Sequence, residues 1–162
     1  MPLSMNIRPI EISDNAEIAK VIRAVLIELE VPKVGTAYAD PQLDCMYETY
    51  MQAKSLYFVV ENNGKIIGGA GIGPLENELA SVCELQKMYF LPEARGSGIG
   101  RQMMQKCLQA AREFGYLRCY LETMPNMNDA QKLYTKTGFD YLCAPLGNTG
   151  HTSCPVWMIK VL

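Results

Sequence analysis

A glycine-rich segment in the second half of the chain is the feature that most limits how this sequence can fold. Met88–Gly100 begins with residues typical of a strand, turns at Pro92 and continues into Arg-Gly-Ser-Gly-Ile-Gly, after which apolar residues recur with helical spacing. Backbone N–H groups in the first turn of a helix lack partners within the helix and carry partial positive charge. Because glycine has no Cβ, the backbone of such a loop can approach a ligand closely. The segment therefore predicts a strand–loop–helix unit that binds phosphate groups.

Two common phosphate-binding motifs do not match this loop. The Walker A motif, GxxxxGK[ST], is absent from the chain. The dinucleotide-binding motif GxGxxG fails at its last glycine, which falls on Arg101 or Met103. The spacing that does fit is RxxGxG, at Arg95, Gly98 and Gly100.

The pattern of apolar residues predicts strands and helices within one domain that spans residues 1–162. The expected strands cover residues 6–10, 56–60, 65–73, 81–90, 117–122, 139–143 and 155–162. The expected helices cover residues 15–31, 43–54, 99–114 and 129–136. Asp14 and Glu17 form a predicted capping box for the first helix, and Asn63-Gly64 predicts a hairpin turn. This order indicates an α/β or α+β fold with a largely antiparallel sheet.

The chain resembles the GCN5-related N-acetyltransferase (GNAT) superfamily. The RxxGxG match is one part of the resemblance, and Ala130–Phe139, which looks like that family's A-x-x-L-Y-x-K-x-G-F segment, is the second. The resemblance implies the GNAT fold, a mixed and mostly antiparallel central sheet of about seven strands flanked by about four helices. It also implies an acetyl-CoA-dependent N-acetyltransferase, which passes the acetyl group directly to a primary amine of a small molecule or peptide.

The resemblance also implies which residues bind the acetyl-CoA cosubstrate. The pyrophosphate would rest on the backbone of the loop formed by Arg95, Gly96, Ser97, Gly98, Ile99 and Gly100. The pantetheine arm would pair with the backbone of Met88 and Phe90, whose amides would lie near the thioester carbonyl and stabilise an oxyanion there. The chain departs from the family at Met127, where many members have asparagine. Asn126 and Asn128 flank this position, and either could substitute.

Two residues are candidates for proton transfer. Tyr134 occupies the position of a tyrosine that in many family members protonates the departing thiolate. A thiol has a pKa of about 8.5 and a phenol about 10, so this transfer is only slightly uphill. Many members carry a basic glutamate where this chain has Gln86, which cannot take a proton. Glu84, two residues earlier on the same face of the strand, is therefore the candidate base.

The resemblance places the acceptor amine near residues 36–50 and 147–154. The polar and aromatic candidates in the first of these segments are Tyr38, Asp40, Asp44, Tyr47 and Glu48. His151, the single histidine, is a further candidate because it lies in a loop. Cys154 is a weaker candidate for a covalent acyl carrier, since the family transfers acetyl directly.

Composition narrows the remaining alternatives. A net charge of −2 without a run of like charges predicts neither nucleic-acid nor membrane binding. The six cysteines form no CxxC pair, so we expect no metal site, buried thiols and a reducing cytoplasm. A homodimer is an expected assembly because family dimers are common. The alternative function is a non-catalytic CoA-binding module or sensor, which Gln86 favours.

Overall fold

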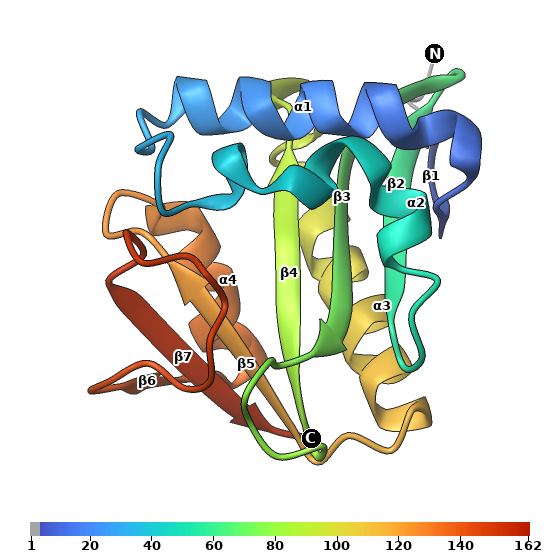
Figure 1. Cartoon of the computed structure of the whole chain (residues 1–162). Helices are drawn as coiled ribbons and strands as arrows, with labels where there is room; N and C mark the ends of the chain where they lie inside the picture. The colour runs from blue at the N-terminus through green and yellow to red at the C-terminus, as the bar shows by residue number, and fades with distance from the viewer. Residues whose placement is uncertain (1–3) are drawn as a thin grey trace.

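The structure is a computed structural model that describes residues 4–162. Its strands form a seven-stranded sheet with the order β1-β2-β3-β4-β5-β7-β6 (Figure 1). Neighbouring strands run antiparallel except for β4 and β5, which run parallel. The strands are β1 (Met5–Pro9), β2 (Leu56–Asn62), β3 (Lys65–Pro74), β4 (Val82–Phe90), β5 (Arg118–Thr123), β6 (Asp140–Leu142) and β7 (Val156–Val161). The predicted class, a mixed and mostly antiparallel sheet with flanking helices, is confirmed.

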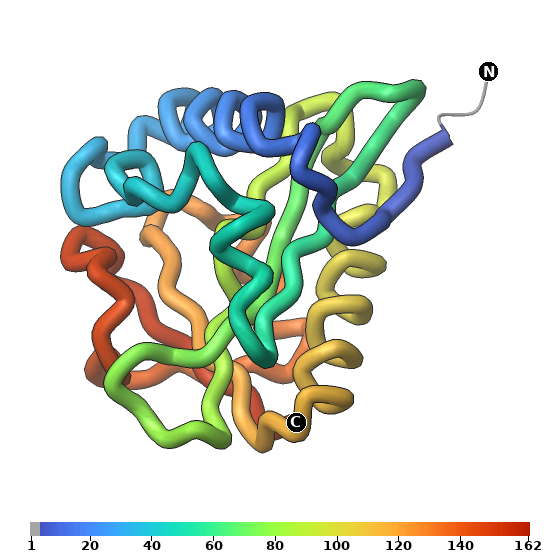
Figure 2. Tube along the Cα trace, turned by 45° about the vertical axis from the view of Figure 1, so that its right-hand side comes forward, coloured from blue at the N-terminus to red at the C-terminus, as the bar shows by residue number. Residues whose placement is uncertain are grey.

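Helices cover both faces of this sheet. The α-helices are α1 (Asn15–Glu28), α2 (Met46–Thr49), α3 (Ile99–Glu113) and α4 (Asn128–Thr137). Short 3-10 helices are η1 (Ile12–Asp14), η2 (Ala37–Ala39), η3 (Pro41–Cys45) and η4 (Pro92–Ala94). Helix α1 crosses one face together with η3 and α2, whereas α3 and α4 lie on the opposite face (Figures 1 and 2).

Strands β2 and β3 have apolar residues on both sides because helices cover both faces of the sheet. Val59 of β2 packs under α1, and the next residue, Val60, packs under α3. Ile66 and Ile67 of β3 divide between the two faces in the same way. Successive side chains of a strand point to opposite faces, so these continuous apolar runs fill two separate clusters.

The predicted capping box at the start of α1 is wrong. Asp14 makes no side-chain cap to α1; its carboxylate accepts from the amide of Glu11 and forms an ion pair with Arg8 of β1 at 2.8 Å. Glu17 accepts a hydrogen bond from the amide of Ile66 at 2.9 Å. Both carboxylates therefore attach α1 to the sheet, a tertiary role that the local sequence pattern does not indicate.

The predicted second helix is much shorter than expected. Residues 43–54 begin within the 3-10 helix η3, continue as the four-residue α2 and then leave the helical conformation, with Lys54 at φ 58°. Asp40 caps η3 by accepting from the amide of Gln42. This segment packs on the α1 face of the sheet, and its polar side chains Thr49 and Tyr50 line the same cavity as Gln86 and Lys87 of β4.

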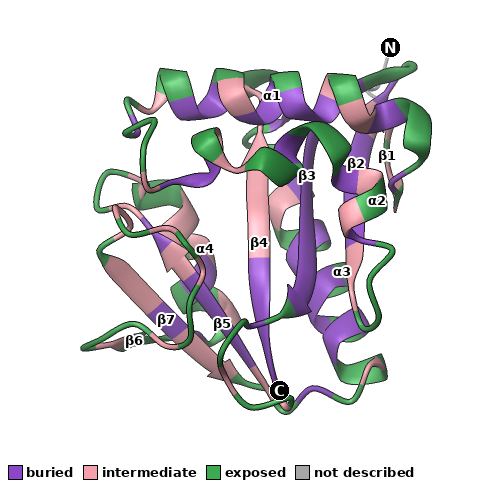
Figure 3. Cartoon of the chain, in the orientation of Figure 1, coloured by how far each residue is buried: buried purple, intermediate pink, exposed green. Residues whose placement is uncertain are grey.

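Strands β4 and β5 separate along their length, and this separation positions the site. Their pairing covers only Val82–Glu84 and Arg118–Tyr120. A bulge follows in β4, where Lys87 has a left-handed φ of 50° and the register against β3 shifts. The first half of β4 is buried, but the second half is only half-buried (Figure 3). The opening between the strands therefore exposes the backbone of the second half of β4.

The cysteine prediction holds for part of the set. Cys83, Cys107 and Cys119 are buried in the core, as expected, whereas Cys45 and Cys143 are exposed. All six thiols are free. Within residues 4–162, no helix has the length and apolar character needed to span a bilayer.

Candidate active site

A cleft of about 540 Å³ opens where β4 and β5 separate, and we call it the β4–β5 cleft. The first turns of α3 and α4 close its other sides. Seven of the eight residues predicted to bind acetyl-CoA line it: Met88, Phe90, Arg95, Gly96, Gly98, Ile99 and Gly100. The end of β4 and the glycine loop, which are consecutive in sequence, thus face the same cleft.

The start of α3 presents free amides to this cleft. Gly98 precedes the helix with φ of 82°, in the left-handed region that glycine enters without steric cost. Across residues 4–162, no side chain caps the first turn of α3. The hydroxyl of Ser97 instead donates to the carbonyl oxygen of Ala94 at 2.6 Å and holds the loop in shape. Uncapped amides beside an open cleft fit the phosphate groups of acetyl-CoA.

The Arg95 side chain fixes this loop to its surroundings. Its guanidinium forms a bidentate ion pair with Glu28 of α1, with both distances 2.8 Å. It also donates to the carbonyl oxygen of Phe90 at 2.9 and 3.1 Å. The side chain is therefore engaged with α1 and β4, consistent with a role for Arg95 in the loop through its backbone.

The backbone of Phe90 faces the cleft rather than β3. The amide of Leu91 donates to the carbonyl oxygen of Ile67 of β3 at 2.8 Å, and successive residues of a strand direct their N–H and C=O groups to opposite edges. Phe90 and Met88 therefore present these groups on the edge that β5 leaves free. The Phe90 carbonyl oxygen already accepts from Arg95, whereas the N–H groups of Met88 and Phe90 are donors that face the cleft.

The departure at Met127 is partly explained by its neighbours. Asn126 donates to the carbonyl oxygen of Leu29 at 2.7 Å and so attaches the start of α4 to the end of α1. The thioether of Met127 lies 3.3 Å from the hydroxyl of Thr123. Asn128, the first residue of α4, lines the β4–β5 cleft without such a side-chain bond. Asn128 is therefore better placed than Asn126 to replace the asparagine that the family carries.

Tyr134 of α4 lies at the inner end of the cleft and is only 6% exposed. Its ring packs against Phe139 with centroids 6.0 Å apart. Its hydroxyl has no hydrogen-bond partner among the described residues. Burial raises the pKa of Tyr134 well above its usual range, so the phenol keeps its proton at neutral pH. Proton transfer from this phenol to a free thiolate is therefore more uphill than the ordinary pKa values of the two groups suggest.

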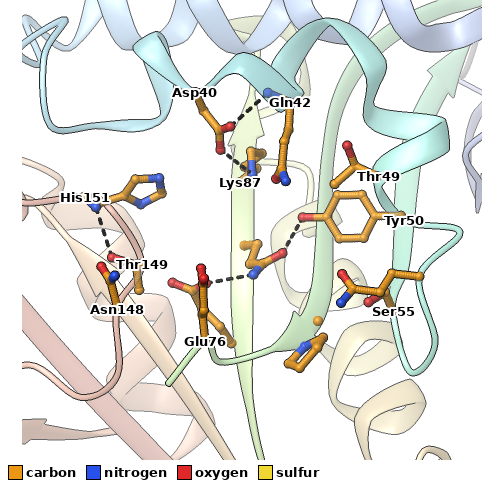
Figure 4. Close-up of a pocket in the computed structure, with 15 residues that line it drawn as sticks. Asp40, Gln42, Thr49, Tyr50, Ser55, Glu76, Lys87, Asn148, Thr149 and His151 are labelled. Carbon is orange, nitrogen blue, oxygen red and sulfur yellow. Dashed lines mark hydrogen bonds and ion pairs between the residues drawn. The ribbon is translucent and has the colours of Figure 1, made fainter. Parts of the chain in front are cut away.

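A second cavity of about 440 Å³, which we call the polar cavity, lies at the opening between η3, α2 and the loop before β7 (Figure 4). Amide, hydroxyl and charged side chains form most of its wall. It is lined by Asp40, Gln42, Thr49, Tyr50, Gln52, Ser55, Gly73, Pro74, Glu76, Glu84, Gln86, Lys87, Asn148, Thr149 and His151. Both segments that the resemblance assigned to the acceptor contribute to this wall.

Most of the individual acceptor candidates do not reach the polar cavity. Of the five, only Asp40 lines it; Tyr38, Asp44, Tyr47 and Glu48 do not. Asp44 pairs with Arg23 at 2.6 Å, and Glu48 accepts a hydrogen bond from Asn15 at 2.8 Å. The two tyrosines pack against the apolar cluster beneath α1. These four side chains stabilise the segment, whereas His151, the other candidate, does line the cavity.

A third, small cavity of about 40 Å³ shares part of its wall with each of these two, and because of this position we call it the passage. It shares Glu84, Gln86, Lys87 and His151 with the polar cavity, and Met88, Tyr89, Met127 and Tyr134 with the β4–β5 cleft. Glu84 and Tyr134, the two predicted proton-transfer residues, thus both line this passage. A group that crossed it would pass between them.

Glu84 is a buried carboxylate at the polar-cavity end of the passage. It is 7% exposed, and its Oε1 accepts a hydrogen bond from the amide of Gln86 at 2.7 Å. Burial raises the pKa of Glu84 to about 7, although the hydrogen bond from Gln86 acts in the opposite direction. The carboxyl group therefore changes its charge near neutral pH.

A family comparison can now be set beside this geometry. The sequence model of the acetyltransferase (GNAT) family matches residues 24–139, which is more than half of the chain. The chain belongs to the GNAT acetyltransferase family. Membership confirms the predicted family and enzyme class, and acetyl-CoA is the acetyl donor of this family.

Similar proteins agree with this membership. YjgM of Escherichia coli, an uncharacterized N-acetyltransferase, is 44% identical over 163 residues that cover 99% of this chain and 97% of that protein. A GNAT-family acetyltransferase from Staphylococcus aureus Mu50 has the same fold, with a TM-score of 0.83 at 20% identity over 98% of this chain and 99% of that one. The yncA protein of Salmonella typhimurium, solved with acetyl-CoA, has a TM-score of 0.77 at 20% identity and covers 98% and 94%.

The fold of this GNAT chain also brings together three residues that the sequence did not link, one of which, Glu122, was not a predicted site residue. One ligand atom each from Glu84, Glu122 and His151 lie within 4.8 Å of one another. Glu122 of β5 accepts hydrogen bonds from the hydroxyls of Tyr120, at 2.7 Å, and Thr149. Burial raises the pKa of Glu122 and lowers that of His151, because it disfavours the charged form of each group. The cluster depends on the pairing of β4 with β5 and on the loop before β7, and the spacing of residues in the sequence predicts neither.

Cys154 lies in the passage wall but is poorly suited to carry an acyl group. Burial, together with the carboxylates of Glu122 and Glu84, raises the pKa of its thiol to about 12. The thiolate is the nucleophilic form of cysteine, so a thiol that keeps its proton is a weak nucleophile. The raised pKa therefore argues against a covalent route through Cys154.

Proposed function

We propose that this chain transfers the acetyl group of acetyl-CoA directly to a primary amine of a small molecule or peptide. The observation that carries the proposal is the pair of cavities joined by one passage. The β4–β5 cleft has free backbone donors suited to acetyl-CoA, and the polar cavity has side chains suited to a hydrophilic amine. Two substrates held in this way would meet in the passage, which favours direct transfer over a covalent intermediate.

Glu84 would accept the proton that the amine must lose before it attacks the thioester. An alkylammonium group has a pKa of about 10.4, so an ordinary carboxylate is a poor base for it. A pKa of about 7 brings Glu84 closer to the ammonium and still leaves much of it ionised near neutral pH. The position of Glu84 at the polar-cavity end matches the side from which the amine would enter.

Tyr134 would return a proton to the CoA thiolate on the opposite side of the passage. Its hydroxyl keeps its proton and has no hydrogen-bond partner among residues 4–162, so it is free to donate to a leaving sulfur.

For the nearby cluster of Glu84, Glu122 and His151 we assign proton transfer at Glu84 rather than metal binding. The oxygens of Glu122 are already used by two hydroxyls, and the Lys87 ammonium lies close enough to lower the pKa of His151.

The test is release of CoA thiol from acetyl-CoA in the presence of a broad panel of primary amines. We expect at least one hydrophilic amine to be acetylated. With that amine, Glu84→Gln and Tyr134→Phe should each lower kcat/KM by about 100-fold, the usual contribution of a general base or acid. Glu113→Gln and Tyr141→Phe, which alter exposed residues away from the cavities, are the matched controls and should leave the rate unchanged.

The alternative, a CoA-binding module without turnover, makes a different prediction. Such a module would bind acetyl-CoA but release no CoA thiol with any amine. Glu84→Gln would then leave thiol release at the same background level. Thiol release that depends on both the amine and Glu84 would exclude it.

A further inference from the structure

Gln86 is the residue that most favours the alternative function, a CoA-binding module without turnover. It stands where many GNAT relatives have a basic glutamate. In the structure it is part of a chain of hydrogen bonds. The hydroxyl of Tyr50 donates to Gln86 Oε1 at 2.6 Å, and Gln86 Nε2 donates to Glu84 Oε1 at 2.7 Å. The chain runs along the wall of the polar cavity, into which Tyr50 points from the end of α2 (Figure 4).

The polarity of this chain is fixed by chemistry. A carboxylate can only accept hydrogen bonds, so the NH₂ group of Gln86 must face Glu84 and its oxygen must face Tyr50. Burial raises the pKa of Tyr50 well above its usual range, so its hydroxyl keeps the proton that it donates. A protonated Glu84 is a weaker acceptor than a carboxylate, so the donor from Gln86 stabilises the ionised form more than the neutral form. The chain therefore matches the ionised form of Glu84 better than the neutral form.

The fold fixes Tyr50 in the position that this chain requires. Tyr50 is 7% exposed, and its ring packs against that of Tyr57 with centroids 5.1 Å apart. Both rings lie against Gly71 of β3, where an added Cβ would come within 2.6 Å of Tyr57 and 3.1 Å of Tyr50. The hydroxyl of Tyr57 donates to the carbonyl oxygen of Lys87 at 2.8 Å and ties the same ring pair to the bulge. Glycine at position 71 thus makes room for the tyrosine that orients Gln86.

We propose that Gln86, oriented by Tyr50, is a positioning residue that holds Glu84 in its ionised form at the mouth of the passage. The inference rests on the proposed function, in which Glu84 is the base. Gln86 then has a role that a glutamate could not fill, because a second carboxylate 2.7 Å from Glu84 would repel its charge. Glu84 can therefore act as the base only because position 86 carries no second carboxylate.

Several other groups also set the charge of Glu84, and the test has to separate them from Gln86. Glu122 on β5 and Asp40 before η3 disfavour the ionised form, whereas Lys87 on β4 favours it. His151 lies in the same cluster and Cys154 in the same passage wall. Gln86 is uncharged, so replacing it by an apolar side chain of similar length removes the hydrogen bond without adding or removing a charge.

The direct test is the titration of Glu84 in protein labelled with ¹³C at the glutamate carboxyl carbons. The Glu84 signal is assigned by its loss in Glu84→Gln. We expect Gln86→Met to move the midpoint of Glu84 upward by about one pH unit, as expected for the loss of a hydrogen bond to the charged form. Tyr50→Phe should move it in the same direction by less. An unchanged midpoint in Gln86→Met would overturn the proposal. Gln109→Met and Tyr141→Phe, at exposed positions, are the matched controls.

Kinetics separate this proposal from the proposed function. If both hold, Gln86→Met shifts the pH profile of kcat/KM upward and recovers most of its rate above the new midpoint, whereas structural damage would lower the rate at every pH. If the midpoint moves but the pH profile does not, Gln86 still positions Glu84 and Glu84 is not the base. Gln86→Glu gives the opposing check. We expect it to lower the rate at pH 7, and a higher rate with an unmoved midpoint would contradict the role of Gln86.

Discussion

The β4–β5 cleft and the polar cavity are built in different ways. The cleft offers mainly backbone groups, namely the first turn of α3 and the free edge of β4, and all of them lie within one continuous segment. The polar cavity offers side chains from segments that are far apart in sequence, brought together only by the sheet. A backbone site depends on glycine and on strand geometry, whereas a side-chain site depends on the identity of each residue. The cleft should therefore tolerate changes of side chain that the cavity does not.

The strongest test of this contrast is a backbone change in the cleft. Gly98→Val places a β-branched residue at φ 82°, a conformation that it rarely adopts, at the start of α3. We expect the Kd for acetyl-CoA, measured by calorimetry, to rise about 100-fold as the amides of the first turn are displaced. Gly64→Val, at φ 80° in the β2–β3 hairpin, is the matched control and should bind normally. Equal losses in the two variants would mean that the effect is general misfolding.

The second test compares the pH dependence of the two regions. Because burial raises the pKa of Glu84 to about 7, the carboxyl group is protonated below that pH and cannot act as a base. We expect kcat/KM for the amine to rise about tenfold between pH 6 and pH 8, with a midpoint near 7. Acetyl-CoA binding, which depends on backbone amides, should change much less over this range. A kcat/KM that does not change between pH 6 and pH 8 would show that Glu84 is not the general base.

A third test changes one charge in the polar cavity. Asp40 forms an ion pair at 3.1 Å with Lys87, whose side chain is only 5% exposed. Asp40→Asn leaves that ammonium without its partner and should raise the KM for the amine by about fivefold, with an unchanged Kd for acetyl-CoA. Asp44→Asn, in the same segment but at an exposed carboxylate that pairs with Arg23, is the control. An equal change in acetyl-CoA binding would show that the two regions are not separate.

The smallest expected effect comes from a side chain that borders the cleft. Glu28→Gln weakens the exposed ion pair with Arg95 but leaves the backbone of the loop in place. Exposed ion pairs are screened by solvent and contribute little to stability, so thermal unfolding and the Kd for acetyl-CoA should both change little. A large loss of binding would mean that the Arg95 side chain, and not only its backbone, is needed in the cleft.

The same contrast explains what could be predicted from the sequence. The glycine loop was recognisable because Gly98 and Gly100 follow a strand and open a helix, all within one local segment. Glu84 and Gln86 were placed on one face by simple strand alternation. Glu122 and His151 were not linked to them, because their proximity depends on the parallel pairing of β4 with β5 and on the loop before β7.

Local patterns failed where tertiary contacts changed the role of a residue. Asp14 and Glu17 have the spacing of a capping box, yet their carboxylates bind Arg8 and the amide of Ile66. Asp44 and Glu48 looked like substrate contacts because they are acidic, yet both are satisfied by partners on α1. In each case a distant partner, which no short window of sequence contains, decides what the side chain does.

The most direct test of the account is the initial-rate pattern when acetyl-CoA and the amine are varied together. Two cavities joined by one passage should hold both substrates at once, so double-reciprocal plots should give intersecting lines, and the protein incubated with acetyl-CoA alone should gain no acetyl mass. Parallel lines, together with an acetyl group on Cys154, would show a covalent route and contradict direct transfer through the passage.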